Sequence, residues 1–363
     1  MNLIDGRFRI DATILGSPTD GLLHATDDAG CGYLVTVLPH YPPRLDEVLR
    51  SGRFDGPGVA PVAFAKADVD GLDIVVEHEP AGRSSRLASP LPPSAARSAA
   101  LELVRRVNAG LSIGHGLPPE LVYLDGGKLA GVAPRLFALR ACVSQTLTWG
   151  YSWFSPYAPP TRERRPTRHD DAYAIGMVLR YWLTGAPPLA NVYEHERESP
   201  MQFLVDLAQG TLLFRYDGPL HEVIDGLVAG DLSRATKLLI AAKVDRAAEA
   251  MRARLVAEVV AHPEDDGPRL VLADWLLEQG DPRGELIQVQ CRHASAPAGA
   301  LAARANQLIA EHGVRWSSHL LPDAGRPVFE RGFVARVECD APEAFRQRAE
   351  ALRAHGPLPA IAS

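Results

Sequence analysis

Apolar residues are densest between residues 171 and 184, where they occupy every face of a helix rather than one stripe. Three polar residues at 169–171 supply capping groups and negative charge for a first helical turn. Gly185, followed by two prolines at 187 and 188, is a typical stop signal. We therefore predict a buried helix over 171–184, with a domain packed around it.

Residues 7–38 show a different pattern, in which short apolar runs alternate with turn signals. This pattern predicts three strands separated by turns near residues 16–21 and 27–30. Helical spacing of apolar residues predicts a helix over 94–113. The chain thus begins with a β-rich region and continues with a helical one.

The last third of the chain changes composition after Pro263. Asp265 or Asp266 is expected to cap a helix over 268–279 that ends at Gly280, and a second helix is expected to begin at residues 283–285. A third helix is predicted over 301–312, a strand-like segment over 329–337 and a last helix over 344–355.

Three residues of this region are candidates for structural roles. Trp275 is expected to anchor a small helical core, because it lies among apolar neighbours on the first of these helices. Asp274 and Arg283 are expected to pair across the turn that follows. A structural ion pair is favoured over a catalytic site, since no histidine or nucleophile accompanies them.

Composition limits the classes of function. The 363 residues are 46% hydrophobic and 23% charged, which is typical of a soluble protein with two or three folding units. A net charge of −6 argues against a general nucleic-acid binder. The four cysteines are far apart, so they indicate neither a zinc site nor a disulfide framework. No apolar run is long enough to span a membrane, and we expect a cytoplasmic protein.

The order of segments through residue 250 resembles that of bacterial serine/threonine protein kinases. The matching segments are the turn at 16–21, the strands at 33–38 and 73–82, the segments 114–124 and 125–133, Tyr157-Ala158-Pro159-Pro160 in the APE place, and the helix ending in Thr184-Gly185-Ala186-Pro187-Pro188. The resemblance implies an α+β, two-lobed protein kinase-like fold. Its small β-rich lobe would cover residues 1–80 and its large helical lobe residues 81–250.

The residues that carry kinase chemistry are missing from the matching positions. Thr36 falls at the phosphate-binding lysine, Gly116 at the catalytic aspartate, Leu121 at the asparagine and Gly131 at the metal-binding aspartate. None of these side chains can act as a base or hold a hard cation. We therefore expect no kinase activity, no metal and no cofactor.

The turn at 16–21 and the start of the buried helix carry further matching residues. Gly16 and Gly21 keep two glycine places of a phosphate-binding loop, but Pro18 removes a backbone donor between them, and a plain hairpin explains the segment equally well. Asp171 is retained, and it is expected to accept backbone N–H groups of the loop that carries His115, which is a structural role.

A segment between the predicted elements is rich in aromatic and basic residues. Trp149 and Trp153 lie in an aromatic cluster that either packs onto the large lobe or presents a surface to a partner. Arg162, Arg164 and Arg165 form a basic stretch that is either a solvated face or a docking patch for an acidic partner.

Residues 262–290 resemble the bacterial repeat-companion domain, with its pattern PxDDxxRLVxADWLxExGDxRGExIxxQ, which often precedes leucine-rich repeats. The resemblance implies a small, mostly helical C-terminal domain over 251–363. No leucine-rich repeat follows. The domain is therefore expected to pack on the kinase-like region or on another molecule.

These observations predict a catalytically inactive, pseudokinase-like scaffold or protein-interaction module in bacterial signalling or assembly. Its partner would be a protein of unknown identity and neither nucleic acid nor membrane. Two alternatives remain open: a nucleotide-binding sensor without turnover, and an enzyme with altered chemistry in the interlobe cleft.

Overall fold

The computed structural model describes residues 3–40, 45, 49, 56, 58–114, 116–135, 167–185, 216, 218–317, 327–338 and 360–362. The chain forms two compact units. The first comprises Met1–Arg86, Ala95–Arg180 and Pro188–Ala242, and the second comprises Leu87–Ser94, Tyr181–Pro187 and Lys243–Ser363. The finer division into 1–80, 81–250 and 251–363 stays a prediction.

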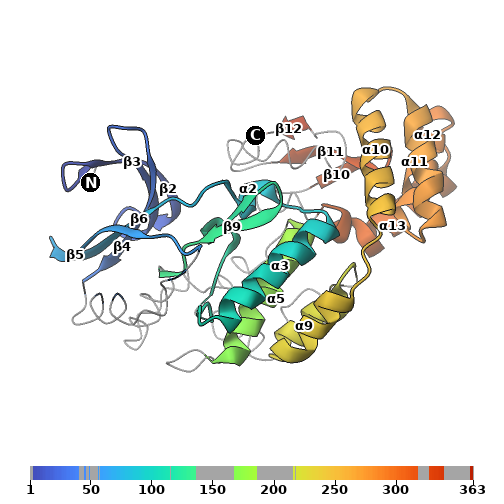
Figure 1. Cartoon of the computed structure of the whole chain (residues 1–363). Coiled ribbons are helices and arrows are strands. Elements are labelled where there is room, and N and C mark those ends of the chain that lie inside the picture. Colours follow the sequence, from blue (N-terminus) through green and yellow to red (C-terminus); the bar gives the residue numbers. More distant parts are fainter. Residues whose placement is uncertain are drawn as a thin grey trace, which may run out of the picture. The chain divides into compact units, whose positions relative to one another are not determined.

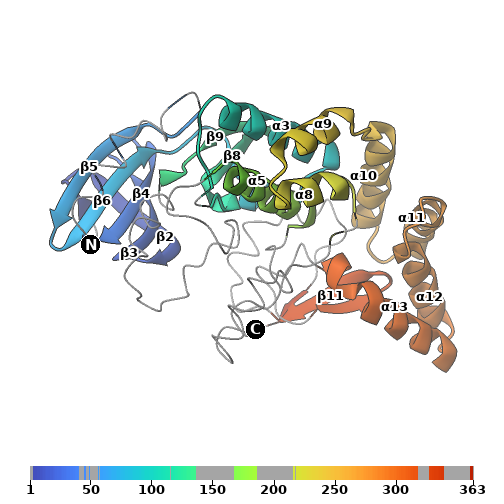
Figure 2. The ribbon, with the colours of Figure 1, turned by 90° about the horizontal axis from the view of Figure 1, so that it is seen from below.

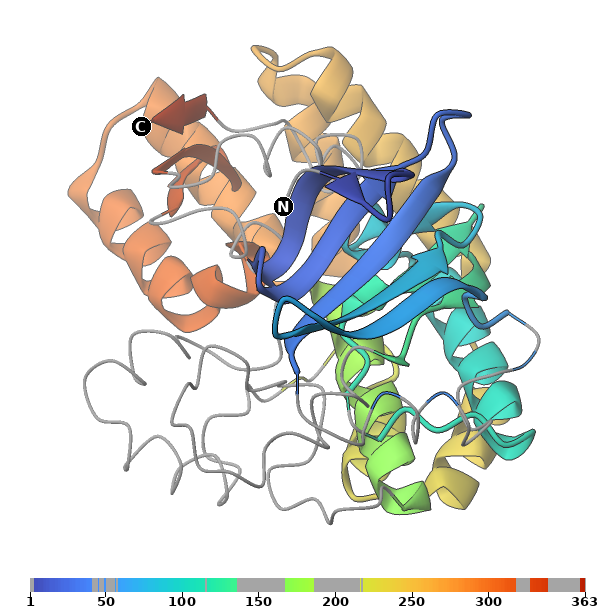
Figure 3. The same ribbon diagram turned by 90° about the vertical axis from the view of Figure 1, so that its left-hand side faces the viewer.

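An antiparallel sheet of six strands opens the first unit (Figures 1 and 3). Its strands are β1 (Leu3–Ile4), β2 (Phe8–Ser17), β3 (Asp20–Thr26), β4 (Gly32–Pro39), β5 (Val62–Val69) and β6 (Leu72–His78), in the spatial order β1-β2-β3-β4-β6-β5. The three strands predicted over residues 7–38 are β2, β3 and β4. One face of the sheet buries a cluster that includes Phe8, Leu23 and Val35. The strands form because their alternating residues can be buried on a pleated surface.

The turn between β2 and β3 is a tight hairpin. Gly16 pairs with Gly21 and Ser17 with Asp20, so only Pro18 and Thr19 lie outside the ladder. The Ser17 hydroxyl accepts a hydrogen bond from the Asp20 N–H at 3.1 Å. The segment is thus a hairpin, and the phosphate-binding remnant at Gly16 and Gly21 stays a prediction.

A small sheet and a group of helices complete the described part of the first unit. The small sheet contains β7 (Arg83–Ser84), β8 (Val122–Asp125) and β9 (Lys128–Val132). The helical elements are α2 (Ser85–Ala88), α3 (Pro93–Asn108), η1 (Pro119–Leu121), α5 (Arg168–Thr184), α8 (His221–Val228) and α9 (Leu232–Ala241). The end of α2, the start of α3 and the last turn of α5 are counted in the second unit. Arg97 of α3 donates to the Leu239 carbonyl of α9 at 2.6 Å, and the neighbouring helices can be followed in Figure 2.

Helix α5 is the buried helix predicted from the sequence. Every residue from Asp170 to Trp182 is buried, and Gly185 ends the helix with φ of 70°. Its first turn is closed by Thr167, whose backbone N–H and hydroxyl donate to Asp170 at 2.6 and 3.0 Å. A Cβ on Gly176 would lie 2.9 Å from the Leu227 side chain, so this glycine permits close approach of α8.

The second unit contains α10 (Arg246–Ala261), α11 (Asp266–Glu278), α12 (Arg283–Ser295), α13 (Gly299–Ser317), β10 (Pro327–Glu330), β11 (Phe333–Glu338) and β12 (Ala360–Ala362) (Figure 1). Asp265 caps α11 by accepting from the Gly267 N–H at 2.8 Å, as predicted. Two hydrophobic clusters hold the unit together. One joins α10, α11, α12 and Phe333, and the other joins α12, α13 and the strands β10 and β11.

These elements make the chain an α+β protein in which an antiparallel β-region precedes a largely helical one, consistent with a two-lobed arrangement. The predicted helix over 344–355 lies outside the described residues. Among the residues that are described, no helix combines the length and apolarity needed to cross a bilayer.

Candidate functional site

The sheet face opposite the Phe8 cluster carries Thr36, which the resemblance to kinases aligns with the phosphate-binding lysine. Strand register brings six side chains onto this face from β3, β4 and β6: Leu22, His24, Leu34, Thr36, Val75 and Glu77. All except His24 are buried, at 0–1% exposure. The face is therefore filled by protein and not open to water.

Thr36 lies on β4, between β3 and β6. Its neighbours across the ladder are Leu22 and Val75, both apolar. Within the described part of the chain, the Thr36 hydroxyl has no hydrogen-bond partner, although it is 1% exposed. A buried hydroxyl without a partner costs about 1–3 kcal/mol. Thr36 thus supplies no positive charge.

Glu77 and Arg135 form a buried ion pair on the same face. Both side chains are almost fully buried, at 1% and 2% exposure, and a guanidinium nitrogen of Arg135 donates to the Glu77 carboxylate. The same nitrogen donates to the Ala60 carbonyl at 2.5 Å. The pair links β6 to the segment after β9. A ligand cannot use either charge without first separating the two side chains.

Three other predicted positions lie in the chain between the end of α3 and the end of β9. Leu121 is fully buried, and Gly116 is buried with φ of 110°. A Cβ on Gly131 would lie 2.4 Å from the Cβ of Pro80 and 3.3 Å from the Gly58 carbonyl oxygen. An aspartate at Gly131 would therefore need the backbone around Pro80 to move. Among the described residues, no group of three potential ligands is placed to hold a metal ion.

Asp171 accepts the two backbone N–H bonds that the sequence predicts for it. Its Oδ1 accepts from Ile113 at 2.7 Å and from Gly114 at 2.9 Å. Burial raises the pKa of Asp171, and the two N–H bonds act in the opposite direction. The carboxylate fixes the loop before His115 to helix α5.

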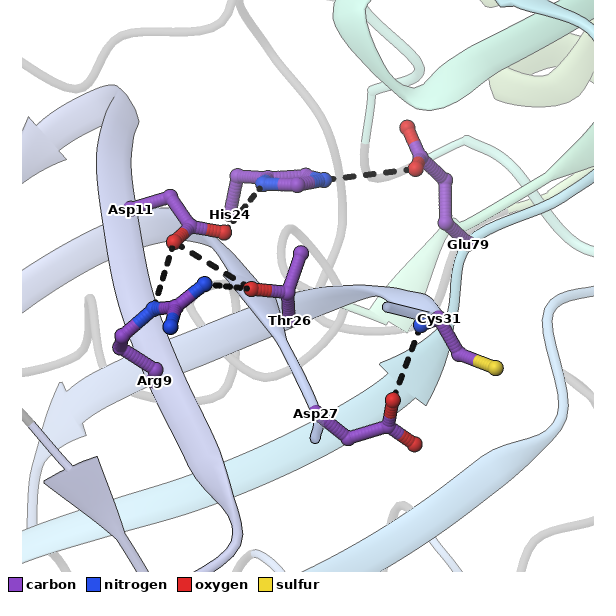
Figure 4. Close-up of polar contacts among 7 residues, drawn as sticks. All are labelled: Arg9, Asp11, His24, Thr26, Asp27, Cys31 and Glu79. Carbon is purple, nitrogen blue, oxygen red and sulfur yellow. Dashed lines mark hydrogen bonds and ion pairs between the residues drawn. The ribbon is translucent and has the colours of Figure 1, made fainter. Parts of the chain in front are cut away.

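A polar network lies at the edge of the buried face (Figure 4). His24 lies between two carboxylates: its Nδ1 is 3.3 Å from Asp11 and its Nε2 is 3.4 Å from Glu79. The Tyr123 hydroxyl of β8 also hydrogen-bonds Glu79. The network therefore connects β2 and β3, through the segment after β6, to the small sheet.

The two carboxylates change the acid–base properties of His24. The hydrogen bond to Glu79 raises the pKa of His24, burial opposes it, and the charges of Glu79 and Asp11 add to the increase. In turn, the hydrogen bond from His24 lowers the pKa of Glu79. Arg9 and Thr26 donate to Asp11 and lower its pKa against the effect of burial. We call this network of Asp11, His24 and Glu79 the clasp, and its bonds are structural because they join separate strands of the sheet.

Asp27 closes the neighbouring turn, which Figure 4 also shows. Its Oδ1 accepts from the backbone N–H groups of Ala29 and Cys31 at 3.0 and 2.9 Å, and its Oδ2 accepts from the Tyr33 hydroxyl at 2.9 Å. The bond to Cys31 is the main cause of the lowered pKa of Asp27. The aspartate thus explains the predicted turn between β3 and β4.

The structure corrects the predicted pair in the second unit. The Asp274 carboxylate accepts from the Gln288 side chain at 2.7 Å and does not pair with Arg283. Arg283 instead donates from Nε to the Gly332 carbonyl at 3.0 Å and lies over the Phe333 ring, with its guanidinium carbon 4.7 Å from the ring centre. Asp274 is exposed and Arg283 is buried, so the two side chains occupy different environments.

Trp275 packs on the cluster of α10, α11 and α12, but it is only partly buried. Leu272 and Leu276 form the buried side of α11, whereas Val271 and Leu277 are 57% and 42% exposed. Trp275 therefore covers the margin of this core and is not its centre.

Several important residues were not identified from the sequence. Glu77 could have been noticed as a charged residue within the apolar run 73–77. Residues two apart on a strand lie on the same face, so Glu77 shares a face with Val75 and would be buried with it. Arg135 gives no such signal. The proposed partner residues Trp149, Trp153, Arg162, Arg164 and Arg165 lie outside the described residues.

In sequence comparisons, no protein-family model and no curated protein matches this chain.

Proposed function

We propose that this chain is a non-catalytic, kinase-like scaffold that acts by binding another protein. The order of the antiparallel sheet, in which β6 lies between β4 and β5, supports a kinase-like small lobe. The resemblance of the C-terminal region to a repeat-companion domain fits a protein that brings partners together. A fold alone does not establish a function, so the argument depends on the site.

One observation carries the proposal. The face that would bind a nucleotide is occupied by buried Leu34, Thr36 and Val75, and its only buried carboxylate among the described residues is neutralised by Arg135. Phosphoryl transfer depends on positioning the phosphates and on metal ions that compensate their charge. Neither a lysine nor a metal-binding side chain occupies the predicted positions. This arrangement disfavours both the sensor and the altered-enzyme alternatives.

The test of the catalytic part is nucleotide binding and phosphoryl transfer by the intact chain. A ligand present at a hundred times its dissociation constant stabilises a folded protein by about 2.7 kcal/mol. We expect millimolar ATP with Mg²⁺ to produce no stabilisation and no phosphate incorporation. Stabilisation without turnover would favour the sensor, and turnover that is abolished by a change of His115 would favour the enzyme.

The scaffold part needs a test with a positive result. We propose Trp149, Trp153, Arg162, Arg164 and Arg165 as the partner surface. The intact chain, the Trp153→Ala variant and an Arg164→Glu/Arg165→Glu variant would be used for affinity capture from the native cells. One protein that binds the parent and is lost in both variants would support the proposal. Arg105→Glu is the matched control, because Arg105 is an exposed arginine of α3.

A further inference from the structure

Helix α11 exposes a group of apolar side chains on the face turned away from its own core. Leu270, Val271 and Leu277 are 38%, 57% and 42% exposed. The other large apolar side chains that are exposed in the described part of the chain lie on three different elements: Leu3, Val62 and Ile240. Single apolar residues on a surface are ordinary, whereas a contiguous group on one element is typical of an interaction site.

The helical period brings these residues into two neighbouring rows. Leu270, Asp274 and Leu277 follow one another at spacings of four and three residues, and Val271 and Trp275 form the next row. The buried residues of α11 lie on the opposite side, against α10 and α12. A helix that is apolar on both sides is normally covered on both sides. The outer face of α11 is therefore built to be covered.

The exposed charged residues of α11 are acidic. Asp274 lies between the two leucines, and Glu278 lies one turn further along the helix. The Asp274 carboxylate accepts from the Gln288 amide at 2.7 Å, which orients the carboxylate without neutralising its charge. Within the described part of the chain, neither acid forms an ion pair. The cation of this helix, Arg269, is buried and donates to two backbone carbonyl groups at 2.8 and 2.5 Å.

These charges select between possible occupants of the face. A twofold contact between two copies of the chain would use the same patch on both. Asp274 and Glu278 of one copy would then face the same acids of the other, and like charges brought together in an interface oppose association. A surface that combines apolar side chains with positive charge is complementary to the face. The occupant is therefore a different, basic protein surface.

We propose that the outer face of α11 is a docking site for a partner helix that carries apolar residues at helical spacing with Lys or Arg beside them. The site comprises these residues: Leu270, Val271, Asp274, Trp275, Leu277 and Glu278. Side chains in rows of three and four residues form ridges that fit the grooves of a second helix. Trp275, at the margin of the core, supplies the large aromatic contact that interfaces favour. The site lies in the second unit and does not depend on the partner surface proposed above.

The first test uses two synthetic peptides of about 15 residues, long enough to form a helix. Both have leucines at the same helical positions, and the remaining positions are lysine in one and glutamate in the other. Fluorescence anisotropy of the labelled peptides with the intact chain measures binding. We expect the lysine peptide to bind, more weakly at high salt, and the glutamate peptide not to bind. No difference between the two peptides would overturn the proposal.

A pair of apolar variants locates the binding. Val271→Gln/Leu277→Gln should weaken binding of the lysine peptide by about tenfold or more, because it removes apolar surface that the peptide buries. Ile240→Gln is the matched control, since Ile240 is 64% exposed on α9, and it should bind as the parent does. The double variant should keep the thermal unfolding midpoint of the parent. A lower midpoint would mean that this chain already covers the face, which contradicts the proposal.

A second pair of variants tests the charges. Asp274→Asn/Glu278→Gln should weaken binding of the lysine peptide and remove most of its salt dependence. Glu222→Gln/Asp225→Asn removes two exposed acids from α8 and is the matched control, which should change neither property. If the α11 variant binds the lysine peptide with unchanged affinity, the acids do not select the partner and the proposal fails.

Photo-crosslinking in the native cells identifies the natural occupant. Val271→p-benzoylphenylalanine places the reactive group on the exposed face, and mass spectrometry identifies the cross-linked segment. We expect a segment of another protein with apolar residues at helical spacing and Lys or Arg between them. A cross-link within this chain, or to a second copy of it, would exclude the proposed partner. The Trp153→Ala variant should give the same cross-link, which separates this site from the partner surface proposed above.

Discussion

Arg135 in the first unit and Arg283 in the second are similarly buried, at 2% and 6% exposure, but their surroundings differ in charge. Arg135 meets the Glu77 carboxylate and the Ala60 carbonyl. Arg283 meets the Gly332 carbonyl and an aromatic ring, while a second arginine lies close enough to lower its pKa. The positive charge of Arg135 is neutralised by the Glu77 carboxylate, whereas the positive charge of Arg283 is only partly compensated.

The two arginines differ in what holds the guanidinium group. A buried ion pair with additional hydrogen bonds satisfies both partners, so it leaves nothing for a ligand to recognise. Arg283 is instead held by a carbonyl oxygen and an aromatic ring, which fix its orientation without neutralising its charge.

The largest expected effect on stability comes from removing one partner of the Glu77–Arg135 ion pair. Arg135→Met leaves Glu77 buried without its cation, and such a loss typically costs about 3–5 kcal/mol. Hydrogen exchange of the intact chain should show lost protection in β4 and β6. The double variant Glu77→Leu/Arg135→Met should recover most of the stability, because apolar residues can replace a buried pair. Arg105→Met, at an exposed position of α3, is the control and should change little. Unchanged protection in Arg135→Met would mean that the pair does not hold this face together.

A graded series on α11 tests how the second unit is built. Leu272→Ala should cost about 2–5 kcal/mol, because Leu272 is 2% exposed in the cluster. Trp275→Ala should cost less than a fully buried tryptophan would, and Val271→Ala should stay within about 0.5 kcal/mol. Limited proteolysis should place new cleavage sites after Pro263 and spare the first unit. Cleavage in both units together would show that they unfold as one.

Much of the fold follows from local patterns. Apolar runs between turn signals predicted β2, β3 and β4, the resemblance implied the strand that is β6, and the apolar helix with its stop at Gly185 predicted α5. The limits of the other helices were less accurate. The helix predicted over 94–113 ends at Asn108, because Gly110 has φ of 112°. The helix predicted over 301–312 extends from Gly299 to Ser317, so it continues through Gly313, which is buried close to Ile309 and Phe329.

The site depends on contacts that local patterns do not contain. Glu77 and Arg135 are 58 positions apart in the chain, and their contact depends on how β9 approaches the large sheet. The predicted partner of Arg283 was wrong because closeness across a turn says nothing about which helix face each residue occupies. Asp274 faces solvent and Gln288, whereas Arg283 faces the interior.

A smaller effect is expected at Gly131. Gly131→Ala places a Cβ against Pro80, and overpacking of this kind costs about 1–3 kcal/mol. Gly131→Asp should be destabilised at least as much, and Mg²⁺ should not restore its stability, because Leu121 and Thr36 supply no further ligand. Thermal unfolding with and without Mg²⁺ measures both. Gly126→Ala is a useful comparison, since its added Cβ meets no neighbour within 4 Å, although its positive φ of 53° causes some strain. A rise in the unfolding temperature of Gly131→Asp on addition of Mg²⁺ would show that the first unit can still bind this ion.

The smallest effect concerns pH, because His24 and its carboxylate neighbours are partly exposed and screened by solvent. The pKa of His24 in the folded protein is raised above its ordinary value of 6.5. Its contribution to stability is therefore fully present below pH 6.5 and is lost as the pH rises through the folded pKa. The pKa values of Asp11 and Glu79 are lowered and that of Tyr123 is raised, so these three groups keep their charge states near neutrality and His24 titrates there.

His24→Gln should therefore reduce the difference in unfolding free energy between pH 6 and pH 8. His40, which has a raised pKa beside Asp73, titrates in both proteins and cancels from their difference. Glu79→Gln should reduce the pH dependence in the same direction, because the bond to Glu79 is the main cause of the raised pKa. Chemical unfolding at several pH values measures both variants. A stability difference between parent and His24→Gln that does not shrink as the pH rises would contradict the clasp, and with it the view that the first unit balances its charges internally.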